Sequence, residues 1–356
     1  MNKVLKYNIL AIFTLCLLSC RKTDVDEGVF ALSFNARAQD IEQEVKAGAG
    51  EGIVKTEEAR LKDNPFGVYG VWNDTEKSIG GNNVFLQSTA QEVKYNSGTG
   101  ETGEWEYSPV QYWKLNKFYR FRAYHPINGK AFTVQNSSDV DLISIDYKVV
   151  NGSEDLMVAF WKGQATASVI KERVPMVFHH CLSGLIIKVG LTDNSSTDSI
   201  TELYIKGLTP NGTMLYTYET PEDPSSTIDY DSATMKWVTE TFDSSTEYYK
   251  WTGSKVIAGG VTSSNPGKAT PVFDGTDHMV FTIPQTCSGT RGNTVIYFKT
   301  EQGGDAVQAV KIPQTEWLPG HIYTYTLLIS PTSKIEVLIS IKDWEAVEIN
   351  EDIHIV

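Results

Sequence analysis

The thiol of Cys20 stands in a sequence context where acylation is expected. An apolar run from Ile9 to Leu18 follows two lysines and leads into Leu-Leu-Ser-Cys at residues 17–20. The run is about ten residues long, too short for a stable membrane-crossing helix and typical of a signal peptide. The four final residues resemble a lipobox, so we expect residues 1–19 to be removed and Cys20 to carry lipid. The alternative is a plain secretory signal with an incidental cysteine.

Acylation would fix the chain to a membrane outside the cytoplasm. Two or three acyl chains attach a protein durably, because each buried methylene contributes ~0.8 kcal/mol. Removing residues 1–19 takes away Lys3 and Lys6 and no acidic residue, so the net charge changes from −13 to −15. Such an acidic chain is a poor partner for nucleic acid and for anionic lipid surfaces.

Two further thiols remain in the mature chain, Cys181 and Cys287. In an oxidising compartment they could pair, but buried free cysteines are also common, and a single bridge is not a disulfide scaffold. The sequence leaves both possibilities open.

Patterns typical of enzymes and metal sites are missing. There is no P-loop, dinucleotide fingerprint, Gly-x-Ser-x-Gly elbow or His-Glu-x-x-His sequence. His179 and His180 are neighbours on an expected strand and would point to opposite faces, so they could not share one ion. Asp139 and Asp141 share a strand face, but two carboxylates are a weak calcium signal. We predict no enzyme, no metal and no cofactor.

The elements that must position these residues are strands. Many aromatic residues and glycines accompany stretches in which apolar and polar residues alternate with period two. The expected strands lie around residues 30–34, 66–72, 119–123, 185–191, 323–329 and 335–341. Turn dipeptides such as Asn128-Gly129 and Asn211-Gly212 separate such stretches. The pattern predicts an all-β protein of two sandwich-like domains.

Three segments interrupt the strands and suggest the domain bounds. Residues 39–64, rich in Glu, Lys and Gly, read as an exposed tether, and residues 171–175 mark a domain boundary. The third, residues 219–251, reads as a long loop or hairpin whose aromatic residues could bind a ligand. The predicted parts are a signal peptide (1–19), a lipidated segment with a removable strand (20–37), a tether (38–64) and two sandwiches (65–174 and 175–356).

Eight short segments are spread along nearly the whole chain in a characteristic order. They are the lipobox, Asn35-Ala36-Arg37-Ala38, Phe66-Gly67-Val68-Tyr69-Gly70, Tyr119-Arg120-Phe121-Arg122-Ala123-Tyr124-His125-Pro126, the stretch from Val177 to Leu185, Ile283-Pro284-Gln285-Thr286, Trp317-x-x-Gly320 before Tyr323-Thr324-Tyr325-Thr326, and Ile341-Lys342-Asp343-Trp344. Each segment alone is a weak signal, but their order and spacing resemble the fimbrillin family of Bacteroidales, the pilins and accessory subunits of type V pili.

The resemblance implies two transthyretin-like β-sandwich domains and export through the periplasm as an outer-membrane lipoprotein on the cell surface. It also implies cleavage by an arginine-specific protease that removes the first strand, after which a strand from another subunit fills the groove. Cleavage between Arg37 and Ala38 fits that pattern, since the arginine follows a strand, and Arg60 is the alternative. The implied function is a pilus subunit that polymerises by strand exchange and supports adhesion.

The residue pattern at both ends of the chain is compatible with strand exchange. Phe30, Leu32 and Phe34 share one strand face and could fill a core. Near the chain end, a similar apolar face could enter a neighbour's groove by strand addition; its residues are Val347, Ile349, Ile353 and Ile355. The alternative is that both strands are ordinary members of their own domains.

A second class of function stays open, that of a tip or accessory adhesin, or a stand-alone surface lipoprotein that binds host glycans or protein. Exposed Trp237 and Trp251 could stack on sugar rings in that case. Two Asp-Ser segments, at Ser199 and Ser232, resemble the O-glycosylation sequences of these bacteria.

Overall fold

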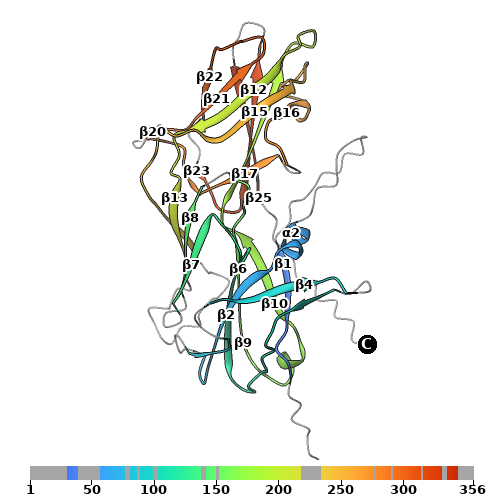
Figure 1. The fold of residues 1–356 in the computed structure, drawn as a ribbon, viewed down its shortest axis with the longest axis vertical. Helices are drawn as coiled ribbons and strands as arrows, with labels where there is room; N and C mark the ends of the chain where they lie inside the picture. The colour runs from blue at the N-terminus through green and yellow to red at the C-terminus, as the bar shows by residue number, and fades with distance from the viewer. Residues whose placement is uncertain are drawn as a thin grey trace, which may run out of the picture.

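The protein is an elongated all-β molecule, seen here in a computed structural model (Figure 1). The structure describes residues 30–38, 57–76, 81–85, 89–98, 103–137, 142–149, 152–217, 234–275, 278–289, 292–313, 316–330 and 335–343. Within these residues, no helix is long and apolar enough to cross a membrane. The expected all-β class is confirmed.

The largest sheet has eight strands and occupies the lower end of Figure 1. Its order is β1 (Phe34–Ala38), β10 (Val174–His180), β9 (Met157–Gln164), β6 (Phe118–His125), β2 (Phe66–Asn73), β4 (Gln91–Asn96) and β5 (Glu104–Glu106), with β3 (Asn82–Asn83) beside β2. Strand β1 runs parallel to β10, and the other pairs are antiparallel.

Three more sheets complete the framework. One has the order β16 (Thr270–Pro271), β11 (Ser183–Leu191), β24 (His321–Ile329) and β25 (Ile335–Asp343), with β17 (Met279–Thr282) on β11. The second is β15 (Tyr248–Val256), β12 (Ser199–Lys206), β21 (Val295–Thr300) and β22 (Gln308–Lys311). The third is β14 (Thr234–Thr239), β13 (Asn211–Thr217), β8 (Leu142–Lys148) and β7 (Phe132–Ser137).

The remaining elements are short. Two small ladders join β18 (Gln285–Thr286) to β23 (Glu316–Trp317) and β19 (Ser288–Gly289) to β20 (Gly292–Asn293). The helical pieces are α2 (Glu57–Asp63), η1 (Val169–Lys171) and η3 (Pro266–Lys268).

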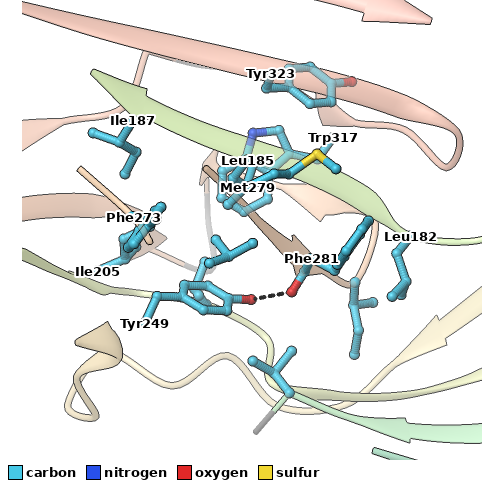
Figure 2. Close-up of a cluster of buried hydrophobic side chains, with 14 of the residues drawn as sticks. Leu182, Leu185, Ile187, Ile205, Tyr249, Phe273, Met279, Phe281, Trp317 and Tyr323 are labelled. Atoms are coloured by element: carbon cyan, nitrogen blue, oxygen red, sulfur yellow. Dashed lines mark hydrogen bonds between the residues drawn. The ribbon is translucent and has the colours of Figure 1, made fainter. Parts of the chain in front are cut away.

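Two large cores hold the sheets together. One lies on the eight-stranded sheet and includes Leu32, Phe34 and Phe66. The other spans the remaining sheets, and Figure 2 draws a part of it around Leu185 of β11. There the Tyr249 hydroxyl donates a hydrogen bond of 2.9 Å to the carbonyl oxygen of Phe281.

The sheets do not divide the chain at residues 174/175. Strand β10 begins at Val174 and pairs with β9 and β1. Conversely, β7 and β8 come before that point and share a sheet with β13 and β14. The division into two sandwich domains stays a prediction.

Two local expectations need correction. The first strand is Phe34–Ala38, not residues 30–34, although Leu32 and Phe34 are buried as expected. The end of the expected tether is helix α2, whose Leu61 is fully buried in the same core as Phe34. The burial of Leu61 and the ammonium group of Lys62 over the Tyr95 ring, 4.9 Å from its centroid, thus dock this charged segment on the sheet.

Candidate functional site

The candidate site is the groove filled by the segment from Phe30 to Ala38. In the described part of the chain, β1 lies at the end of its sheet and has one ladder partner, β10. The buried and exposed side chains of β1 alternate strictly. Leu32, Phe34, Ala36 and Ala38 all face the core and are at most 3% exposed.

Phe34 is the centre of this contact. Its ring meets four aromatic rings at centroid distances of 5.4 to 6.4 Å, those of Phe66, Phe85, Tyr107 and Phe121. The pairs with Phe66 and Phe121 are edge-on, a geometry that adds to the free energy gained by burial. Removing Phe34 would leave a cavity among rings from β2, β6 and the segments at residues 85 and 107.

The segment changes partner at Ser33. Before it, Ala31 forms an antiparallel bridge with Tyr112, and the Leu32 amide donates to the Gln111 carbonyl at 2.8 Å. From Ser33 onward the ladder is with β10, beginning with the Val174 amide donating to the Ser33 carbonyl at 2.8 Å. The segment from Phe30 to Ala38 therefore hydrogen-bonds to two different parts of the chain, the stretch around residues 111–113 and strand β10.

Tyr107 adds a side-chain hydrogen bond to the contacts that hold this segment. Its hydroxyl donates to the Leu32 carbonyl at 2.8 Å and accepts from the Gln111 amide at 3.2 Å. Burial raises the pKa of Tyr107 to about 12, so the donor proton is retained throughout the physiological range. Sequence reasoning missed Tyr107, because no pattern distinguishes it from other aromatic residues.

The structure places Arg37 inside β1, not beyond it. Arg37 is exposed and pairs with Val177, and Ala38 pairs with Phe178. The alternative, Arg60, is half-buried in α2, next to the buried Leu61. Of the two arginines, Arg37 therefore lies on extended edge backbone and Arg60 lies within a docked helix.

A second edge lies at the far end of the chain. Strand β25 pairs with β24 over its whole length and ends its sheet in the described residues. Ile335 and Val337 pack on the core, but Ile339 and Ile341 on the same face are 38% and 51% exposed. Val347, Ile349, Ile353 and Ile355 lie outside the described residues.

The histidine pair is not a metal site. His180 is fully buried, and its Nδ1 is 2.6 Å from Oδ2 of Asp155, whereas the half-buried His179 points to the other face. Burial lowers the pKa of His179. No group of three metal-ligating side chains occurs among the described residues. Asp139 and Asp141 lie outside them.

Cys181 and Cys287 are both buried and free. Burial raises the pKa of each thiol, so neither is a reactive thiolate. The open question of a disulfide is thus answered in favour of two core cysteines. Cys20 lies outside the described residues.

The aromatic surface expected around residues 219–251 is not found in the described part. The Trp251 side chain is buried, and its Nε1 donates to Asp274 at 2.8 Å. Trp237 packs against the core and donates to the Cys181 carbonyl at 2.9 Å. The Trp251 ring is therefore not available to stack on a sugar, and Trp237 is half-buried. Ser199 is also buried, at the start of β12, which disfavours an O-glycan there, and Ser232 lies outside the described residues.

Comparison with known proteins places these features in a family. A family model described as fimbrillin-like matches residues 56–344. The chain belongs to this fimbrillin-like family. The resemblance read from the sequence is thereby confirmed, and the protein is a non-enzymatic pilus or adhesion subunit of the cell surface.

Solved structures show that the fimbrillin-like chain shares its fold with other surface proteins. A fimbrial protein from Bacteroides vulgatus is 17% identical, covers 89% of this chain and 100% of its own, and has a TM-score of 0.58. A putative cell adhesion protein from Bacteroides ovatus is 15% identical, covers 90% and 99%, and has a TM-score of 0.52. A search of curated proteins gave no match.

Proposed function

We propose that this fimbrillin-like protein is a pilus subunit that is acylated at Cys20, exported to the outer membrane, and activated when a protease removes the strand segment ending at Arg37. A strand from the next subunit then fills the groove. The single observation that carries the proposal is the position of β1, an edge strand whose Phe34 side chain fills the core.

An edge position makes removal feasible. Strand β1 has one ladder partner among the described residues, so its loss leaves the ladder of β10 with β9 intact. The remaining sheet keeps its order but exposes a row of unpaired backbone groups on β10. Such an edge is a template for another strand.

The emptied groove has a large affinity for a matching strand. Leu32 and Phe34 each contribute ~1.5–3 kcal/mol when buried, and the replacement of four such side chains amounts to roughly 10 kcal/mol before ordering costs. Backbone pairing with β10 adds register and direction. The apolar face of residues 347–355 offers side chains of this type.

The choice of Arg37 over Arg60 rests on accessibility. The Arg37 side chain is exposed on extended backbone, a form that a protease can bind once the edge opens. Cleavage at Arg60 would first require α2 to unfold and Leu61 to leave the core. Cleavage after Arg37 removes Phe34 and leaves Ala38 as the new first residue.

The test compares Arg37→Ala with Arg60→Ala in cells that express the arginine-specific protease. N-terminal sequencing and intact mass are measured for protein from membranes and from sheared filaments. We expect the parent and Arg60→Ala proteins in filaments to begin at Ala38, and Arg37→Ala to remain a lipidated monomer that begins at Cys20. Filaments of Arg37→Ala in parental amounts would refute the assignment.

A further inference from the structure

The groove that holds β1 imposes an order of side-chain sizes on the strand that fills it. The core-facing side chains of β1 and their partners on β10 are all at most 3% exposed. The pairs, which lie side by side in the ladder, are Phe34 with Val174, Ala36 with Met176, and Ala38 with Phe178. A large side chain therefore always stands beside a smaller one, the arrangement that fills a core without voids.

The site of Phe34 is wide and aromatic. The Phe34 ring is fully buried and meets four other aromatic rings at centroid distances of 5.4 to 6.4 Å. An aliphatic side chain in this site would leave a cavity, because packed neighbours relax only partly around a missing group. The site therefore selects an aromatic side chain.

The site of Ala36 is shallow, because larger side chains around it already fill the core. Its neighbour on β10, Met176, is fully buried. The next β10 side chain on this face, Phe178, packs its ring against Phe66 at a centroid distance of 5.1 Å, and Leu61 of α2 is fully buried in the same core. Additional methyl groups in a filled core force side chains out of their preferred rotamers. The site therefore selects a side chain as small as alanine.

The apolar chain end of this protein does not have that order of sizes. Its alternating face consists of Val347, Ile349, Glu351, Ile353 and Ile355. In either strand direction and in every register, the site of Phe34 would receive an aliphatic side chain or a glutamate. The site of Ala36 would receive no side chain as small as alanine. The chain end thus offers apolar surface to a groove but fits this groove poorly.

We propose that the groove prefers a donor strand from a different subunit, one that carries a bulky apolar, an aromatic and a small residue at successive alternate positions, as Leu32, Phe34 and Ala36 do. This inference rests on the strand exchange proposed above and names its partner. Backbone pairing with β10 is common to every donor, so the side-chain sites decide between donors. The chain end of a second copy enters the same groove more weakly.

The test is a competition for the groove of the chain that begins at Ala38. A labelled peptide of residues 30–37 is bound first, and its displacement by unlabelled peptides is followed by fluorescence anisotropy. We expect Phe34→Ile and Ala36→Ile in the competing peptide each to weaken its affinity by about tenfold or more. Asn35→Ile is the matched control, because it places the same side chain on the exposed face and should change the affinity by less than about threefold.

A peptide of residues 347–355 should also bind about tenfold or more weakly than the parent peptide. Equal affinities of the parent and Ala36→Ile peptides, or of the parent and 347–355 peptides, would overturn the preference and leave strand exchange standing. If no peptide binds, the parent included, strand exchange and the preference both fall.

A second measurement covers the case in which the chain that begins at Ala38 does not fold without a strand. Ala36→Ile and Asn35→Ile are then compared in the uncleaved chain by urea titration. Ala36→Ile should lower the midpoint, because the added carbon atoms enter a filled core, and Asn35→Ile should leave it nearly unchanged. Equal midpoints for the two variants would show that the Ala36 site accepts large side chains and would overturn the proposal.

Discussion

At the scale of single residues, the removable-strand proposal depends on Phe34. Its side chain is fully buried among four aromatic rings, so Phe34→Ala creates a cavity that the surrounding rings cannot fill. We expect a loss of ~3–5 kcal/mol in the free energy of unfolding, measured by urea titration of the uncleaved chain. Asn35→Ala is the control, since Asn35 is exposed on the same strand and should change stability by less than ~0.5 kcal/mol. Equal effects would show that Phe34 does not fill the core.

A second prediction at this scale concerns pH. The folded pKa of His125 is about 4, below the usual 6.5, so between these values the unfolded chain binds a proton that the folded chain does not. Stability is therefore complete above pH 6.5 and falls as the pH drops toward 4, by an amount of the order of 3 kcal/mol. Asp155 and His180 also face this ring.

The measurement for this prediction is a series of urea titrations between pH 4 and 8. His125→Gln removes the titrating ring, so its stability should vary less with pH over the same window. Parallel curves for the parent and the variant would contradict the argument.

Residue patterns predicted some of the site and missed other parts for identifiable reasons. The alternation in the sequence predicted that Leu32 and Phe34 share a buried face. Ala36 and Ala38 continue this alternation, so a longer buried face could have been predicted. Trp237 was expected at the surface because its segment is polar. The structure instead packs Trp237 against the core and hydrogen-bonds it to the Cys181 carbonyl, contacts with distant residues that no local pattern encodes.

At the scale of elements, the strand β1 should be separable from its sheet and replaceable. A chain that begins at Ala38 should have a lower thermal midpoint than the uncleaved chain, because the Phe34 pocket is open. A synthetic peptide of residues 30–37 should restore the midpoint when each chain binds one peptide, since it supplies the core face and the ladder to β10.

The matched control is the same peptide with Phe34→Asp, which keeps the backbone but would bury an unpaired carboxylate. We expect it to leave the midpoint at the value of the truncated chain. Restoration by both peptides would mean that the groove does not recognise the apolar face. Scanning calorimetry measures the midpoints of all four samples: the uncleaved chain, the truncated chain, and the truncated chain with each peptide.

Long alternating strands were predictable as elements, and their partners were not. Strands β2, β6, β11, β24 and β25 coincide with stretches of period-two alternation. Helix α2 is seven residues long, too short for a helical period to stand out, and it is held by tertiary contacts such as the burial of Leu61. The pairing of β8 with β13 joins residues far apart in the chain. The alternation within a strand does not indicate which other strand it pairs with.

At the scale of the whole molecule, the described chain has two kinds of edge that suit polymer formation. Strand β1 ends one sheet and covers a groove, and β25 ends another and carries the exposed Ile339 and Ile341 just before the apolar chain end. A subunit that receives a strand at one place and gives one at another makes head-to-tail contacts. Such contacts form open filaments when the rotation between successive subunits does not close a ring.

This geometry leads to a prediction about mixtures of subunits. A chain truncated after Asp343 keeps the groove and loses residues 347–355, so it should fold and be cleaved but form no filaments alone. Mixed with the full chain, it should accept a strand and give none, and each truncated subunit should end one filament. Mean filament length in electron micrographs should therefore fall as its fraction rises.

Two point variants of the full chain test which side chains of the chain end make it a donor strand. Ile349→Asp places a charge on the proposed donor face and should behave like the truncated chain, because its burial in a groove would leave the carboxylate unpaired. Glu351→Ala changes the one residue that interrupts that apolar face and should polymerise at least as well as the parent. If the truncated chain forms filaments by itself, the chain end is not the donor, and the exposed face of β25 becomes the segment to test.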